Sequence, residues 1–249
     1  MNNEDIILSV EKLNSFYKKT VPGKFRRERI QVLKDVTFDM KKGEILGLVG
    51  ESGCGKSTLA KTILNMVPDY SGTIICNDKN PQMVFQDPHG SLNPSKTIEF
   101  LLSEPMRNLT DIPQSEWRDR AAEMLVRVGL DEDYLGRLPR ELSGGQRQRV
   151  CIAASLMLKP GLLIADEPVS ALDVTIQAQV CELLLKLKEE LGLSILFISH
   201  DLRVVYQLCD RVIIMKNGEI KESGTTDEVY FNPQNEYTKK LLNAAFGVD

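Results

Sequence analysis

A stretch at residues 50–58 combines glycine, lysine and hydroxyl side chains at a spacing that suits a polyphosphate. It reads Gly50-Glu51-Ser52-Gly53-Cys54-Gly55-Lys56-Ser57-Thr58 and has the form G-x-x-x-x-G-K-S. The apolar run at 45–49 predicts a buried strand before it, and the apolar spacing over 57–64 predicts a helix after it. A strand, a glycine-rich turn and a helix together direct backbone N–H groups and the positive helix end at one point. The stretch therefore predicts a nucleotide site, in which Lys56 reaches the β- and γ-phosphates and the Ser57 hydroxyl binds Mg²⁺.

Acidic and basic side chains follow two other apolar runs. Asp166 and Glu167 end the run at 161–165, and a buried parallel strand that delivers acids at its end is what α/β nucleotide sites require. Asp166 would hold Mg²⁺ through its water shell, and Glu167 could polarise an attacking water. His200 follows the run at 194–199, and its expected place on the same sheet edge favours a catalytic role over a structural one.

Two further features could contact a nucleotide. Residues Ser143, Gly144, Gly145 and Gln146 predict a helix start whose serine hydroxyl, bare backbone and dipole would favour an anion. An ordinary helix capped by Ser143 is the alternative. Phe16 and Tyr17 close the first expected strand, where an aromatic ring could stack on a base or pack in the core. Cys54 could block nucleotide entry when oxidised, although a tolerated small residue is the favoured interpretation.

The elements that must position these residues follow an α/β pattern. Apolar alternation and short apolar runs predict strands at 6–13, 31–40, 45–49, 71–76, 82–85, 161–165 and 194–199, with a hairpin at 211–222 around Asn217-Gly218. The basic segment 18–29 is expected to be a solvated hairpin loop, with contact to lipid headgroups or a partner as the alternative. Residues 97–159 become mostly helical, which predicts an inserted helical lobe, and helices are also expected around 176–191 and 236–245.

Composition limits the possible partners and location. A net charge of −4 and a pI near 5.4 argue against bulk binding to nucleic acid. No run approaches the roughly 18–20 apolar residues of a membrane-spanning helix, and the acidic start lacks the layout of a secretory signal. The five cysteines are scattered without a C-x-x-C pair, which disfavours a zinc or iron–sulfur site. The chain is therefore expected in the cytosol, unless a partner holds it against a membrane.

Taken in order along the chain, these motifs resemble the ATP-binding subunits of ABC transporters over essentially the whole length. The resemblance rests on 50–58, Gln86, Leu142-Ser143-Gly144-Gly145-Gln146, 162–167, Ser170-Ala171-Leu172-Asp173 and His200. The LSGGQ stretch separates this family from other phosphate-loop NTPases. The resemblance implies one ABC ATPase domain with a phosphate-loop (RecA-like) core and an antiparallel β subdomain over 1–86 and 160–249. It places the inserted α-helical subdomain at about 87–159.

The resemblance also implies a role for each candidate residue. Tyr17, or less favourably Phe16, would stack on the adenine of ATP, and residues 50–58 would cradle the phosphates. Gln86 would contact Mg²⁺ and the attacking water, Asp166 would take the metal, Glu167 would be the general base and His200 would contact the γ-phosphate. Residues 143–146 would close over ATP bound to a second ATPase subunit, with Asp173 in that interface. The helical lobe would receive a coupling helix from a membrane-spanning partner.

Two segments narrow the subgroup. Residues 84–94, Val84-Phe85-Gln86-Asp87-Pro88 onward, and the tail 232–242 resemble the importers of peptides and nickel. Such importers usually pair two different ATPase chains with two permeases and an extracytoplasmic binding protein, at the cytoplasmic face of the membrane and without nucleic acid. The short segment 72–82 and the end soon after Leu242 look closer to nickel or metal-chelate members. A soluble ABC ATPase and an exporter subunit are the alternative interpretations.

Overall fold

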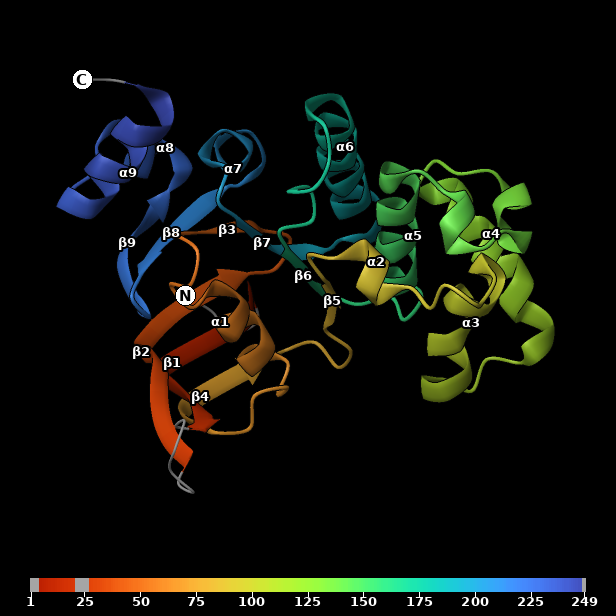
Figure 1. Cartoon of the computed structure of the whole chain (residues 1–249), viewed down its shortest axis with the longest axis horizontal. Helices are drawn as coiled ribbons and strands as arrows, with labels where there is room; N and C mark the ends of the chain where they lie inside the picture. Colours follow the sequence, from red (N-terminus) through yellow and green to blue (C-terminus); the bar gives the residue numbers. More distant parts are fainter. Residues whose placement is uncertain (1–4, 21–26, 248–249) are drawn as a thin grey trace. The chain divides into compact units, whose positions relative to one another are not determined.

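The computed structural model describes residues 5–20 and 27–247, which divide into two compact units (Figure 1). The first unit joins Met1–Lys79 to Ser194–Asp249, and the second is Asn80–Leu193. None of the described helices is long and apolar enough to cross a membrane.

An antiparallel sheet of three strands forms one part of the first unit. Its order is β2-β1-β4, with β1 at Ile6–Thr20, β2 at Arg27–Lys41 and β4 at Tyr70–Cys76. Apolar residues that alternate along β1 and β2 give this sheet a fully buried face. Its members include Leu8, Val10, Leu13, Leu33 and Met40.

The basic segment between β1 and β2 differs from the prediction. Both strands run into it, and Lys18 pairs with Arg29 in the ladder, so a loop over 18–29 was wrong at both ends. The Arg29 guanidinium lies 3.5 Å from the centre of the Phe16 ring and donates a 2.7 Å hydrogen bond to Asp69. These contacts stabilise a cation on the strand. The prediction had instead taken the basic residues as a sign of a solvated loop. Residues 21–26 lie outside the described part of the chain.

Parallel strands carry the rest of the first unit. Strand β3 (Ile45–Val49) pairs in parallel with β7 (Ser194–Ser199) and β8 (Arg211–Lys216), and β9 (Glu219–Thr225) pairs antiparallel with β8. Every residue of β3 and β7 is buried, as expected for strands covered on both faces. The predicted hairpin is confirmed: Asn217 and Gly218 have φ values of 51° and 83°. Only glycine fits at 218, because a Cβ there would lie 1.9 Å from the Val32 carbonyl oxygen.

Helices of the first unit follow its strands. They are α1 (Lys56–Ile63) after β3, α7 (Leu202–Leu208) after β7, and α8 (Thr226–Phe231) and α9 (Glu236–Phe246) after β9. The close approach of α7 to β3 depends on Gly47, where a Cβ would lie 2.8 Å from Val205. Helix α9 agrees with the predicted helix at 236–245.

The second unit is mostly helical around one short parallel pair, β5 (Gln82–Val84) and β6 (Leu162–Asp166). Its buried core is built from aliphatic residues that include Ile98, Leu102, Leu125, Val150 and Ile152. The assignment of the helical subdomain to about 87–159 stays a prediction. The helices are α2 (Pro88–Ser91), α3 (Ile98–Leu109), α4 (Trp117–Arg127), α5 (Gly144–Leu156) and α6 (Val174–Leu191), with 3₁₀ turns at Gln114–Glu116, Glu132–Gly136 and Pro139–Glu141.

Candidate nucleotide site

The turn between β3 and α1 is open to a ligand. Gly53 and Gly55 have φ values of 80° and 115°, in the left-handed region where a Cβ is unfavourable. Gly55 is the N-cap of α1, and none of the described side chains caps this helix start. The first turn of α1 carries Lys56 and no acidic residue. The turn therefore presents backbone N–H groups and a positive helix end to an anion such as a phosphate.

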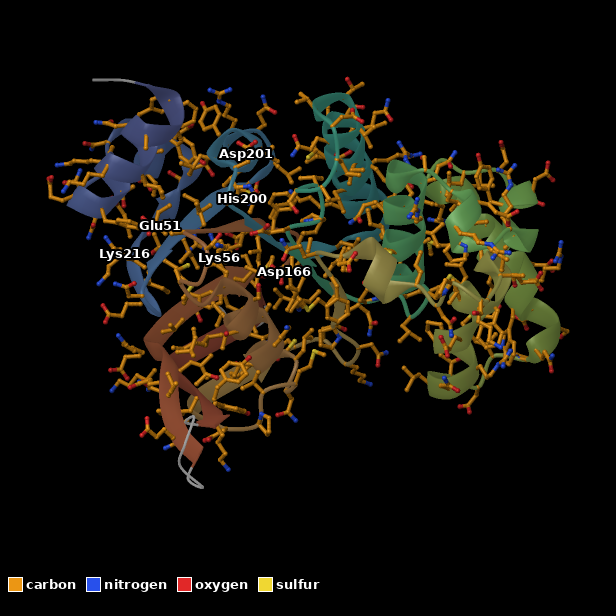
Figure 2. All side chains as sticks on the ribbon, in the orientation of Figure 1. Glu51, Lys56, Asp166, His200, Asp201 and Lys216 are labelled. Carbon is orange, nitrogen blue, oxygen red and sulfur yellow. The ribbon has the colours of Figure 1, made fainter. Side chains whose placement is uncertain are left out.

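Lys56, labelled in Figure 2, is buried at this turn. The residue is 6% exposed, and its Nζ donates hydrogen bonds to the carbonyl oxygens of Gly50 at 2.7 Å and Glu51 at 3.2 Å. A buried ammonium needs such partners, because burial without them is costly. Phosphate oxygens form stronger, charge-assisted bonds, so a phosphate in the turn would compete well for this ammonium.

Cys54 is a packing residue in this geometry. Its side chain is 5% exposed, and burial raises the pKa of its thiol although nearby Lys56 lowers it in part. Because the thiolate is the reactive form, a buried thiol with a raised pKa is poorly reactive. The structure thus favours the interpretation of a tolerated small residue over that of an oxidation-sensitive one.

The two aromatic candidates for base stacking differ in their surroundings. Phe16 already carries the Arg29 guanidinium on its ring, whereas Tyr17 is 40% exposed. The exposed ring of Tyr17 fits a stacking role better, but this role stays a prediction.

His200 follows β7 directly, as predicted, and is exposed. The next residue, Asp201, begins α7: its side chain accepts a hydrogen bond from the backbone N–H of Arg203 at 2.9 Å. The helix cap therefore holds the turn that carries His200. Its catalytic role stays a prediction, as does a shared sheet edge with Asp166 and Glu167.

Carboxylates at the end of β6 lie in the second unit. Asp166 is 4% exposed at the last position of the strand, and Glu167 follows it. The Gln86 amide donates a 3.0 Å hydrogen bond to a Glu167 carboxylate oxygen, so the structure brings together two site candidates that are far apart in the sequence. Glu167 has a φ of 47°, a conformation that is uncommon for a residue with a side chain and that clusters at functional sites.

The turn at 143–146 is a helix start with a reciprocal side-chain cap. Ser143 caps α5 by accepting from the Gln146 backbone N–H at 3.3 Å, and the Gln146 side chain accepts from the Ser143 N–H at 2.9 Å. The Gln146 amide also donates to the Tyr134 hydroxyl at 2.9 Å. Tyr134 was not predicted from the sequence, because nothing in its local pattern connects it to residue 146.

Comparison with known proteins agrees with this set of motifs. Residues 33–170 match the family model described as ABC transporter. The chain is 43% identical to the oligopeptide transport ATP-binding protein AppF of Bacillus subtilis, over 97% of this chain and 79% of that protein. The chain belongs to the ABC transporter family.

Two further relatives extend the comparison. The oligopeptide transport ATP-binding protein OppF of Salmonella typhimurium is 46% identical over 86% of this chain and 69% of that protein. A dimeric ATP-binding cassette, MJ0796, bound to ADP and phosphate, has a TM-score of 0.75 at 29% identity and covers 88% of this chain and 98% of its own.

As an ABC ATPase, this chain binds and hydrolyses ATP. The predicted fold class is confirmed: the protein has the α/β phosphate-loop NTPase fold of ABC cassettes, with an antiparallel sheet and a helical region. The candidate site residues belong to two different units. The phosphate loop and His200 belong to the first unit, and Gln86, Asp166, Glu167 and residues 143–146 to the second.

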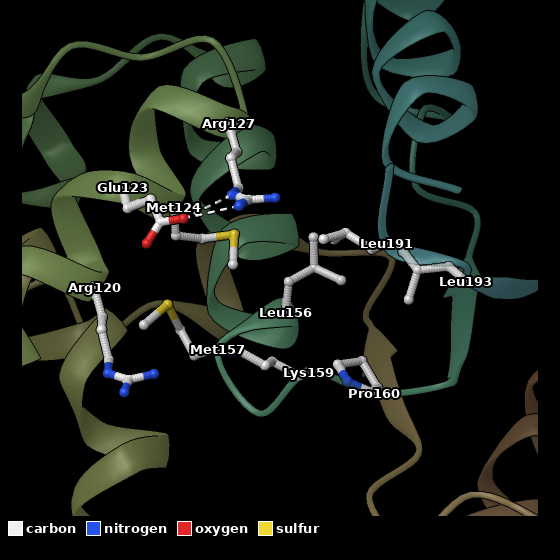
Figure 3. A pocket seen from close by; sticks show the side chains of 10 residues that line it. All are labelled: Arg120, Glu123, Met124, Arg127, Leu156, Met157, Lys159, Pro160, Leu191 and Leu193. Atoms are coloured by element: carbon white, nitrogen blue, oxygen red, sulfur yellow. Dashed lines mark hydrogen bonds and ion pairs between the residues drawn. The ribbon is translucent and has the colours of Figure 1, made fainter. Parts of the chain in front are cut away.

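A pocket in the second unit of this ABC ATPase is distinct from the candidate site residues (Figure 3). It has a volume of about 240 Å³, and Leu156 and Met157 are part of its apolar wall. Its two arginines are paired, Arg127 with Glu123 and Arg120 with Glu116, both at 2.8 Å. This pairing makes the pocket a poor site for a polyphosphate. The remaining lining residues are Met124, Lys159, Pro160, Leu191 and Leu193.

Proposed function

We propose that this ABC ATPase powers the uptake of peptides through membrane permeases, at the cytoplasmic face of a cell membrane. One observation carries the proposal: the similarity to an oligopeptide transport ATP-binding protein extends over 97% of this chain and 79% of the relative. A match of that extent includes the residues outside the nucleotide motifs, where ABC ATPases of different subgroups differ. The segments at 84–94 and 232–242 support the same subgroup.

The hydrolytic step is proposed to use residues of both units. Glu167 takes a proton from the attacking water, and the Gln86 amide, bonded to it at 3.0 Å, orients that carboxylate. Lys56 exchanges its backbone acceptors for β- and γ-phosphate oxygens, and His200 donates to the γ-phosphate.

Oxygen donors are available for the magnesium that accompanies ATP. Ser57, Gln86 and Asp166 offer a hydroxyl, an amide carbonyl and a buried carboxylate, which suit a hard cation. Magnesium held by these residues would neutralise charge on the β- and γ-phosphates.

At the adenine end of the nucleotide, the exposed ring of Tyr17 is the proposed stacking surface.

A second ATPase subunit, a different chain, is proposed to complete each site. Its ATP would be covered by Ser143, Gly144, Gly145 and Gln146 of this chain, with Asp173 in the interface. The dimeric state of the MJ0796 cassette with ADP and phosphate supports this arrangement. In the single chain the Ser143 oxygen accepts the capping bond from the Gln146 N–H, and the hydroxyl hydrogen can donate to a phosphate oxygen without breaking that bond. Two permeases and an extracytoplasmic binding protein would complete the importer.

Uptake measurements in the native cell test the proposal and its cargo. Deletion of this gene should abolish accumulation of a radiolabelled tripeptide, and the wild-type gene should restore it. The Glu167→Gln gene should not restore it, although the protein accumulates to the same level. Unchanged tripeptide uptake in the deletion strain, with loss of radiolabelled nickel uptake instead, would overturn the peptide assignment and favour the metal branch.

A further inference from the structure

Tyr237, in the first turn of α9, lies beside the phosphate loop, although it belongs to no nucleotide motif. Its ring is covered by Lys216, whose Nζ lies 4.1 Å from the ring centre (Figure 2 labels Lys216 and Glu51). Its hydroxyl oxygen is buried and forms no hydrogen bond of good geometry with a described residue. A buried hydroxyl without a hydrogen-bond partner is unfavourable. A conformation of the protein in which it gains a partner would therefore be stabilised.

Glu51, the second residue of the phosphate loop, is the group that faces this hydroxyl. Burial is the main cause of the raised pKa of Tyr237; the backbone of Glu51 opposes the shift, and the carboxylate of Glu51 adds to it. Both the backbone and the carboxylate of Glu51 are therefore close to the phenol.

The position of Tyr237 is fixed by the strands before it. The Glu222 carboxylate on β9 accepts from the backbone N–H groups of Gln234 at 2.6 Å and Asn235 at 3.1 Å. The Asn235 side chain then caps α9 by accepting from the Tyr237 N–H at 2.9 Å. Since each of these bonds joins the start of α9 to the hairpin or to the helix itself, Tyr237 is held firmly rather than on a loose tail.

The same hairpin also holds the other side of the phosphate loop. The N–H of Gly218, in the turn between β8 and β9, donates to the Cys54 carbonyl at 2.8 Å. The Gly218 carbonyl in turn accepts from the Lys34 N–H on β2 at 2.9 Å. One hairpin therefore fixes the middle of the loop through Gly218 and orients Tyr237 toward its start.

We propose that Tyr237 is a positioning residue for the phosphate loop, whose hydroxyl bonds to Glu51 when nucleotide fills the loop. The tail helix α9 then contributes to ATP affinity without touching the nucleotide. The inference depends on nucleotide binding by this chain and not on the cargo, so the uptake experiment above can fail without affecting it.

Removal of the hydroxyl alone separates this role from ring packing. Tyr237→Phe keeps the ring and its contact with Lys216, so the melting temperature of the nucleotide-free full chain should be unchanged or slightly raised. The Kd for Mg-ADP, measured by titration calorimetry, should rise about 2–10-fold, the usual worth of one hydrogen bond. In ATPase assays of the assembled transporter the KM for ATP should rise and kcat should stay the same.

Tyr230→Phe is the matched control. The Tyr230 hydroxyl already donates a 2.6 Å hydrogen bond to the Leu202 carbonyl. Its removal should lower the melting temperature of the nucleotide-free chain and leave the Kd for Mg-ADP unchanged, which is the reverse pattern.

A double substitution tests whether Tyr237 acts through Glu51. In a Glu51→Ala background, Tyr237→Phe should produce no further rise in the Kd for Mg-ADP, because its partner is already gone. Equal effects of Tyr237→Phe in both backgrounds would overturn the proposal. So would an unchanged Kd in the single variant, or a fall in nucleotide-free stability as large as that of Tyr230→Phe.

Discussion

The helix starts at α1 and α5 look alike in sequence but differ in how their backbone N–H groups are capped. Both combine glycines with a serine near a helix end. At α1 the N-cap is Gly55 and none of the described side chains caps it, so the first N–H groups remain for a ligand. At α5 Ser143 and Gln146 satisfy one another in a capping box. The α1 start presents its N–H groups without a side-chain cap, whereas at α5 the Ser143 hydroxyl already binds one of them.

The glycines at the two starts also serve different purposes. Gly55 needs a left-handed backbone, with φ at 115°, where the loop enters α1. Gly145 lies within α5 and is required by packing, since a Cβ there would lie 2.6 Å from the Ile176 methyl group on α6. Glycine-rich motifs of similar appearance thus reflect backbone conformation in one unit and helix packing in the other.

We expect the phosphate loop of the first unit to dominate the nucleotide affinity of the single chain, and Glu167 and the α5 start of the second unit to act in turnover and partner contact. Substitution of Lys56 should then weaken binding, whereas substitution of Glu167 or Ser143 should spare binding by the single chain and impair turnover. Three variants test that separation.

Glu167→Gln should have the largest effect. The amide keeps the shape of the side chain and its contact with Gln86 but cannot accept a proton, so kcat should fall about 10²–10⁴-fold. The Kd for Mg-ATP should change little. Phosphate release by the assembled transporter and calorimetric titration measure the two quantities.

An exposed carboxylate on α6 provides the control for that variant. Glu182 is exposed on the same unit, and Glu182→Gln should leave both quantities unchanged. Hydrolysis at the wild-type rate in Glu167→Gln would contradict the role of Glu167, and loss of ATP binding would contradict the division between the units.

Lys56→Ala should weaken the binding of Mg-ATP. It removes a buried ammonium that would form charge-assisted bonds to phosphate oxygens, so the Kd for Mg-ATP should rise about 10–100-fold. Lys61→Ala, in the last turn of the same helix, removes an equal charge away from the loop and should leave the Kd nearly unchanged. Equal losses in the two variants would mean that charge alone, and not the loop geometry, determines affinity.

Much of the fold could be predicted because local patterns determined it. The buried runs at β3, β6 and β7 are continuous in apolar residues, and Asn217-Gly218 specified a hairpin turn. The full lengths of β1 and β2 could not be predicted. They depend on contacts such as that of Arg29 with Phe16 and Asp69, which lie far apart in the sequence.

The candidate site likewise contains residues that local sequence patterns predict and residues that they do not. The loop 50–58, Asp166, Glu167 and His200 were found because each adjoins a recognisable strand or helix. Tyr134 and Tyr237 were missed, since their contacts with Gln146 and Glu51 arise only from tertiary packing. The bond between Gln86 and Glu167 joins strands that are separated by the whole helical segment, so no local pattern predicts it.

Ser143→Ala should have the smallest effect on the single chain and the clearest effect on the assembly. Loss of the cap should lower the free energy of unfolding by about 1 kcal/mol. The Kd of the isolated chain for Mg-ATP should not change, because its own phosphate loop is intact. ATPase activity of the assembled transporter should fall, since the same hydroxyl is proposed to contact the nucleotide of the neighbouring subunit.

Thr225→Ala is the matched control, because Thr225 and Glu228 form the same capping box at α8 in the first unit. Chemical denaturation should show a similar loss of about 1 kcal/mol in both variants, so stability cannot explain a difference in turnover between them. If the two variants lose ATPase activity equally, the α5 start is only a structural cap. If Ser143→Ala alone loses activity, the hydroxyl that caps α5 in the single chain also contacts the nucleotide of the neighbouring subunit.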